Sequence, residues 1–116
     1  MSVEIGSKVR EMLGEPTAEQ LEHILTLEEK YWRKVYDVKA ELYAGAVGEG
    51  DMVTGMRVKV NLEGPNSRWE SAFIVSRKGF ILVVPEVVRH ALHNMRSDIK
   101  ERIIKESFHG KKHEIR

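Results

Sequence analysis

The sequence contains no cysteine, and this absence excludes several kinds of protein chemistry. Without thiols the chain can form no disulfide, no thiolate metal site and no cysteine nucleophile. It also has no apolar run near the roughly 18 residues that a membrane helix needs. Its first residues, MSVEIGSKVREML, lack the apolar stretch of a secretory signal peptide. We therefore expect an intracellular, cytoplasmic protein that does not enter a membrane.

An excess of charge of one sign is also lacking. Nineteen basic and eighteen acidic residues give a net charge of +1, so overall charge supplies no attraction to nucleic acid. A nucleic-acid role would need basic residues gathered on one face. The 116 residues, 41% hydrophobic and 32% charged, fit one globular domain over residues 1–116 with a heavily charged surface.

Residues 17–44 have the pattern of one long amphipathic helix. Apolar residues at alternating spacings of three and four form a seam, interrupted by Glu28, of the kind that faces another helix. A helix of this span would be about 42 Å long, whereas a compact chain of this size is roughly 35 Å across. Either the helix breaks, or one end is buried by a second subunit, where Glu28 would need a Lys or Arg partner. The seam residues are Leu21, Ile24, Tyr31, Val35, Val38 and Leu42.

A β-hairpin is the best-specified part of the sequence. Apolar and polar residues alternate strictly over residues 56–63, and Gly64 to Ser67 have the composition of a turn. A four-residue loop sets the register of the two strands, and the pattern of the second strand agrees with it. The predicted pairs are Glu63 with Arg68, Leu62 with Trp69, Val60 with Ser71, Val58 with Phe73 and Met56 with Val75.

A third strand is predicted at residues 80–84, FILVV, which is apolar on both faces. Together with Ala72 and Ile74, Phe80 and Leu82 would give the sheet a second apolar patch, so we expect both faces to be covered. A helix that starts after Pro85 and runs to about Phe108 would cover one face, and residues 109–116 should fray as a basic tail.

The predicted fold is therefore α+β. It consists of a short helix within residues 2–13, the long helix, a three-stranded antiparallel β-meander and a C-terminal helix. This order of elements resembles the layout of small bacterial nucleoid-associated dimers, a likeness of architecture that no sequence motif accompanies.

Histidines are the first residues to consider for chemistry. His90 and His93 stand three apart on the last helix, and His109 and His113 stand four apart, which are spacings that can place two imidazoles on one metal. A zinc site needs three or four converging ligands with supporting hydrogen bonds, so we predict no metal site and no cofactor.

Catalytic patterns are also scarce. No serine lies in a nucleophile-elbow motif, and Glu63 and Glu70 are better explained as cross-strand partners of Arg68 and Asn61. A protein without enzymatic activity is favoured, and a small enzyme or metal-binding protein with a histidine-containing site is the third alternative. Trp69 is a potential stacking platform, but the alternation places it on the apolar face, which favours a core role.

Basic residues in the second predicted turn, Arg77 to Gly79, and along the last helix are the candidates for nucleic-acid binding. If the turn and the helix align, these residues form one surface for phosphates, although Glu86, Asp98 and Glu101 lie between them. The candidate residues are Arg77, Lys78, Arg89, Arg96, Lys100, Lys111 and Lys112.

The leading hypothesis is a small homodimer that binds DNA or RNA. Its interface would combine the helix seam with Ile74 and Leu82 of the second apolar patch. The alternative is an adaptor or structural component whose exposed apolar surface receives a different protein. The sequence does not decide between these partners.

Overall fold

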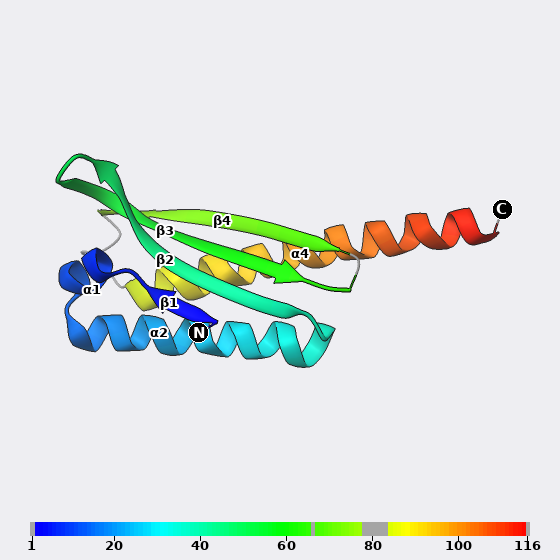
Figure 1. The fold of residues 1–116 in the computed structure, drawn as a ribbon, viewed down its shortest axis with the longest axis horizontal. Coiled ribbons are helices and arrows are strands. Elements are labelled where there is room, and N and C mark those ends of the chain that lie inside the picture. Colours follow the sequence, from blue (N-terminus) through cyan, green and yellow to red (C-terminus); the bar gives the residue numbers. More distant parts are fainter. Residues whose placement is uncertain (1, 66, 78–83, 116) are drawn as a thin grey trace.

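The protein folds as one four-stranded sheet with helices on one of its faces (Figure 1). The computed structural model describes residues 2–65, 67–77 and 84–115, and the side chains of these except Val84 and residues 103–115. The elements are β1 (Val3–Ile5), α1 (Ser7–Leu13), α2 (Glu15–Tyr36), β2 (Lys39–Glu49), β3 (Met52–Glu63), β4 (Arg68–Ser76) and α4 (Val84–Ile115).

The strands lie in the order β1-β2-β3-β4, with β1 parallel to β2 and the other pairs antiparallel. A parallel pair needs a long crossover connection, and α1 and α2 provide it. The junction is held by backbone hydrogen bonds: Leu42 donates to the Ser2 carbonyl at 2.8 Å, and Gly6 donates to the Ala44 carbonyl at 2.8 Å. The predicted helix within residues 2–13 therefore begins only at Ser7, after a three-residue strand.

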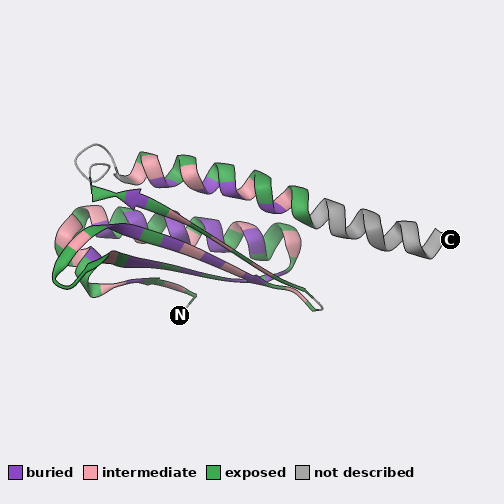
Figure 2. Cartoon of the chain, turned by 90° about the horizontal axis from the view of Figure 1, so that it is seen from above, coloured by how far each residue is buried: buried purple, intermediate pink, exposed green. Residues whose placement is uncertain are grey.

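The core lies between the sheet and the helices α2 and α4. Figure 2 shows the buried positions of both helices recurring at about one per turn, as expected for amphipathic helices on a sheet. On β3 every second residue from Met56 to Leu62 is fully buried, because successive side chains of a strand point to opposite faces. The core residues of α2 and α4 are Ala18, Leu21, Ile24, Leu25, Trp32, Val88, Leu92, Met95 and Ile99, and α1 adds Val9.

The predicted hairpin is confirmed, with its register. Glu63 lies opposite Arg68, Leu62 opposite Trp69, and the remaining three predicted pairs are also Cα partners between β3 and β4. Trp69 is half-buried and packs against the core, as predicted for the apolar face. The hairpin begins earlier than predicted, since β3 starts at Met52.

The prediction of one helix over residues 17–44 is confirmed as far as Tyr36 and is wrong from Asp37 onward. α2 ends at Tyr36 because Asp37 adopts the left-handed conformation (φ 53°, ψ 42°), which terminates the helix. The chain then returns along the sheet as β2, whose burial alternates from Lys39 to Ala44. With 22 residues α2 spans about 33 Å, so the argument from excess length does not apply to it.

The predicted start of the long helix also differs. α2 begins at Glu15, two residues before the predicted start, with Gly14 as N-cap and Pro16 in its first turn. Gly45 and Gly48, which follow the predicted helix, lie in β2. The short turn between β2 and β3 contains Gly50, whose φ is +57°.

The predicted three-stranded meander is replaced by a sheet in which β1 and β2 supply two strands that the sequence analysis missed. Residues 80–83 of the predicted third strand, with Phe80 and Leu82, lie outside the described residues, and Val84 begins α4. α4 covers one face as predicted and continues to Ile115, through the segment expected to fray. Among the described elements no helix covers the other face, which we call the open face (Figure 1).

Candidate functional site

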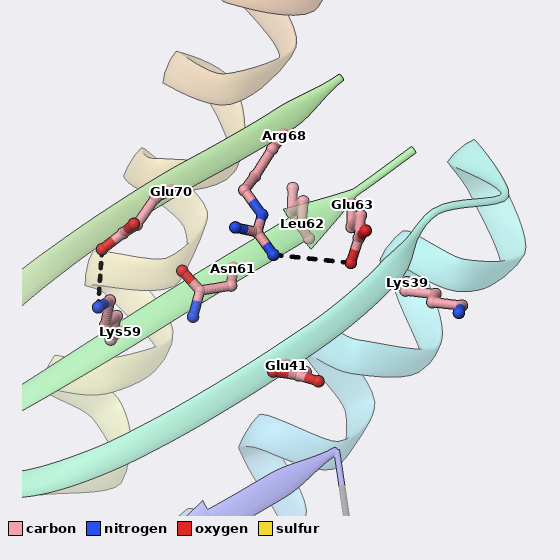
Figure 3. Close-up of a pocket in the computed structure, with 8 residues that line it drawn as sticks. All are labelled: Lys39, Glu41, Lys59, Asn61, Leu62, Glu63, Arg68 and Glu70. Atoms are coloured by element: carbon pink, nitrogen blue, oxygen red, sulfur yellow. Dashed lines mark ion pairs between the residues drawn. The ribbon is translucent and has the colours of Figure 1, made fainter. Parts of the chain in front are cut away.

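The open face carries a small charged pocket formed by β2, β3 and β4 (Figure 3). Lys59 Nζ lies 2.8 Å from Glu70 Oε1, and Arg68 lies 3.9 Å from Glu63. The predicted pairing of Glu63 with Arg68 is thus confirmed, and Glu70, which is opposite Asn61 in register, reaches Lys59. Ion pairs as exposed as these contribute little to stability. The carboxylates of Glu70 and Glu63 are each paired with a cation, Lys59 and Arg68. The lining residues are Lys39, Glu41, Lys59, Asn61, Leu62, Glu63, Arg68 and Glu70.

A buried ion pair joins α2 to α4 on the covered side of the sheet. Glu28 is 5% exposed and accepts hydrogen bonds from Trp32 Nε1 at 2.9 Å and from Arg96, which it binds through two guanidinium nitrogens. Arg96 also stacks on Tyr31, with 3.8 Å between its Cζ and the ring centroid. The cation that Glu28 requires is therefore supplied by the same chain.

α4 presents basic residues toward α2 at helical spacing. Arg89 pairs with Glu86 at 2.6 Å, and Lys100 Nζ lies 5.3 Å from the centroid of Tyr31. Hydrogen bonding to Tyr31 raises the pKa of Lys100 above its usual value. Arg89 and Arg96 line a shallow pocket between the two helices, together with Ile24, Leu27 and Leu92.

The other predicted nucleic-acid residues are only partly placed. Arg77 is exposed and donates a hydrogen bond to the Val53 carbonyl at 3.4 Å, at the opposite end of β4 from Arg68. Lys78 lies outside the described residues. Lys111 and Lys112 lie within α4, but their side chains are outside the described part of the structure.

The predicted interface residues differ in how far they are buried. Leu21, Ile24, Val38 and Leu42 are buried in the core of their own chain, where they have no surface to offer a partner. Tyr31 is half-buried beneath Arg96.

Two of the interface residues are exposed: Val35 at 57% and Ile74 at 58%. Leu82 lies outside the described residues. Leu27, which is 53% exposed on α2, is not one of the seam residues of the sequence pattern and was not predicted.

Charge is divided unequally along the chain. Residues 84–116 hold eight basic and five acidic residues and four of the five histidines, whereas residues 1–83 hold eleven basic and thirteen acidic residues. The overall net charge of +1 is the sum of +3 in residues 84–116 and −2 in residues 1–83. A comparison of the two segments would have revealed this from the sequence.

The described residues contain no group of three or more His, Asp or Glu side chains that could hold a metal ion. His90 and His93 are both exposed on α4. In the same part of the chain no helix is long and apolar enough to cross a membrane.

Comparison with protein-family models, with curated proteins and with solved structures found no match to this chain. Fold and surface therefore define only a class: an α+β protein with a long, basic C-terminal helix and a sheet that the described helices cover on one face.

Proposed function

We propose that this protein is a small non-enzymatic homodimer that binds nucleic acid through α4. The observation that carries the proposal is the net charge of +3 in residues 84–116, against −2 in the remainder. Cations gathered on one helix displace counterions from phosphates, and an α-helix fits the major groove of DNA. Charge separated in this way also orients the protein as it approaches a polyanion.

The second half of α4 supports this proposal more strongly than the first. Arg89 and Arg96 are each paired with a glutamate, so their charges are already partly satisfied. Residues 100–116 hold six basic and three acidic residues. α4 has 32 residues and is about 48 Å long. It is therefore longer than β3, whose twelve residues span about 40 Å.

The test is the salt-dependent binding of labelled DNA and RNA, measured by fluorescence anisotropy. Lys111→Glu with Lys112→Glu should weaken binding at least roughly tenfold at low salt and make its salt dependence shallower. Lys30→Glu with Lys34→Glu is the matched control, because it changes the net charge equally on exposed positions of α2. Equal effects of the two pairs, or no binding at low salt, would contradict a site on α4.

A second candidate is a protein-partner adaptor, favoured by Leu27 and Val35 on α2. Both side chains are more than half exposed, and Leu27 lines the pocket between α2 and α4. Apolar side chains of this size at helical spacing suit a partner helix. A stoichiometric protein that co-purifies with the wild type and is lost with Leu27→Glu would favour this candidate.

A further inference from the structure

Tyr43 lies on the open face, in the middle of β2 and beside the edge strand β1. It lies in β2, is 45% exposed, and leans along the strand over two glycines. A Cβ placed on Gly45 would lie 2.5 Å from Tyr43 Cε1, and one on Gly6 would lie 3.2 Å from the phenol oxygen. The ring therefore rests against backbone that only glycine leaves accessible, while Tyr43 as a whole stays 45% exposed.

Two cations stand next to this ring on β3. Lys59 is the Cα partner of Tyr43, and Arg57 is the Cα partner of Gly45. Residues that share a pair position project from the same face of an antiparallel sheet, so both side chains belong to the open face. Lys59 is paired with Glu70, whereas Arg57 is exposed and makes no ion pair with any described residue.

An apolar neighbour completes the group. Ile74 on β4 is the Cα partner of Arg57 and is 58% exposed. The open face near Tyr43 thus combines a supported aromatic ring, a free guanidinium group and an exposed aliphatic side chain. Acidic residues flank this group: Glu4 is the Cα partner of Tyr43 on β1, Glu41 lies two positions earlier on β2, and Glu70 on β4 pairs with Lys59.

These groups fit a splayed nucleobase and its phosphate better than they fit a duplex. A base stacks on an aromatic ring only when its own face is free, as in a single strand, while adjacent Arg and Lys hold the backbone. Arg57 and Lys59 lie on the β3 side of the ring, away from Glu4 on β1. A phosphate there would meet Arg57, which has no ion-pair partner among the described residues, and would compete with Glu70 for Lys59.

We propose that the open face binds single-stranded nucleic acid, with one base stacked on Tyr43 and the flanking phosphates contacted by Arg57 and Lys59. The inference rests on the proposed function in one respect: both take nucleic acid as the ligand. The site is separate, because α4 lies on the other face of the sheet (Figure 1).

The experiment measures binding of a labelled uridine decamer and of an RNA duplex of equal length. Tyr43→Ser should weaken decamer binding by roughly tenfold, as removal of one stacking platform does, while Tyr43→Phe keeps it within about twofold. Arg57→Gln should weaken binding and make the salt dependence shallower. Met52→Ser is the control, since it removes an exposed apolar side chain at the turn between β2 and β3, away from Tyr43.

A purely structural role for Tyr43, in which the ring only covers Gly45, predicts unchanged binding for Tyr43→Ser. That outcome would overturn the inference, and it would leave the proposed function standing if the Lys111 and Lys112 reversal still weakened binding. Binding of the duplex but not of the decamer would also overturn the inference and leave the proposed function standing. No binding of either RNA probe would overturn the inference, and the DNA arm of the anisotropy experiment would then decide the proposed function separately.

Amide chemical shifts of the wild-type protein provide a second measurement. It does not depend on whether a Tyr43 variant folds. On addition of the decamer, the amides of Tyr43, Gly45 and Arg57 should shift. Shifts confined to α4 would overturn the inference.

Discussion

At the scale of single residues, Glu28 determines how the two long helices are held together. A carboxylate that is 5% exposed is costly to bury unless it is paired and hydrogen-bonded, and Arg96 and Trp32 satisfy it. Tyr31 then covers the guanidinium group of Arg96. This arrangement makes the contact between α2 and α4 directional, which apolar packing alone would not.

Arg96→Leu should lower the free energy of unfolding by about 2 kcal/mol, because it leaves Glu28 buried without its cation. Fully buried pairs lose about 3–5 kcal/mol in this way, and Arg96 is partly exposed. Adding Glu28→Gln should recover part of the loss, since the two residues act as one unit. Urea denaturation measures both effects.

Arg102→Leu is the comparison, because the pair of Arg102 with Asp98 is exposed on both sides. Its cost should stay within about 0.5 kcal/mol. A similar loss for both arginine variants would mean that burial of Glu28 has no special role.

Gly45 gives a second prediction at this scale. Gly45→Ala should destabilise the wild-type protein by about 1–2 kcal/mol, because the new methyl group would displace the ring of Tyr43. In a Tyr43→Ser background the same substitution should cost much less, and a double-mutant cycle in urea measures the difference. Equal costs in both backgrounds would show that the ring does not rest on Gly45.

At the scale of elements, the end of α2 is fixed by one residue. Asp37 occupies the left-handed position that usually favours glycine at a helix C-terminus. Asp37→Gly should therefore raise the free energy of unfolding by about 0.5–1 kcal/mol, and Asp37→Val should lower it by at least about 1 kcal/mol. Thermal unfolding would measure both, and a loss of stability with glycine would contradict the cause given for the helix end.

The hairpin could be predicted from sequence because two independent signals agree there. The alternation over residues 56–63 identifies which face is buried, and the four-residue loop sets the register, so a slip by one residue would have exposed every apolar side chain. The structure contains the predicted pairs.

β2 could not be recognised in the same way because its start continues the helical spacing of the preceding segment. Val38 and Leu42 are four residues apart and fit a helix seam, while Ala40, Leu42 and Ala44 fit a strand equally well. The left-handed residue Asp37 separates the two readings, and aspartate is only a weak signal of that conformation. Placing Tyr43 on a helix concealed the open-face group around it.

At the scale of the whole molecule, the homodimer remains a proposal with fewer candidate contacts. Sedimentation equilibrium at micromolar concentration should give about twice the chain mass of 13.3 kDa. Val35→Glu should shift the distribution toward monomer, because it introduces a charge into the predicted interface. Met52→Glu is the control, as Met52 is 68% exposed and lies at the far end of the hairpin. A monomer at every concentration would contradict the proposal.

The parallel strand β1 has a consequence for the order in which the chain folds. The β2–β3 and β3–β4 hairpins each close a loop of a few residues. Val3, in contrast, pairs with Leu42 across a loop that contains both α1 and α2. A three-residue strand that closes so long a loop gains few contacts for the entropy it loses. We therefore expect hydrogen exchange to release the Leu42 and Gly6 amides, bonded to Ser2 and Ala44, well before those shared by β3 and β4. Such an opening would leave β2 briefly as an edge strand without unfolding the rest of the sheet.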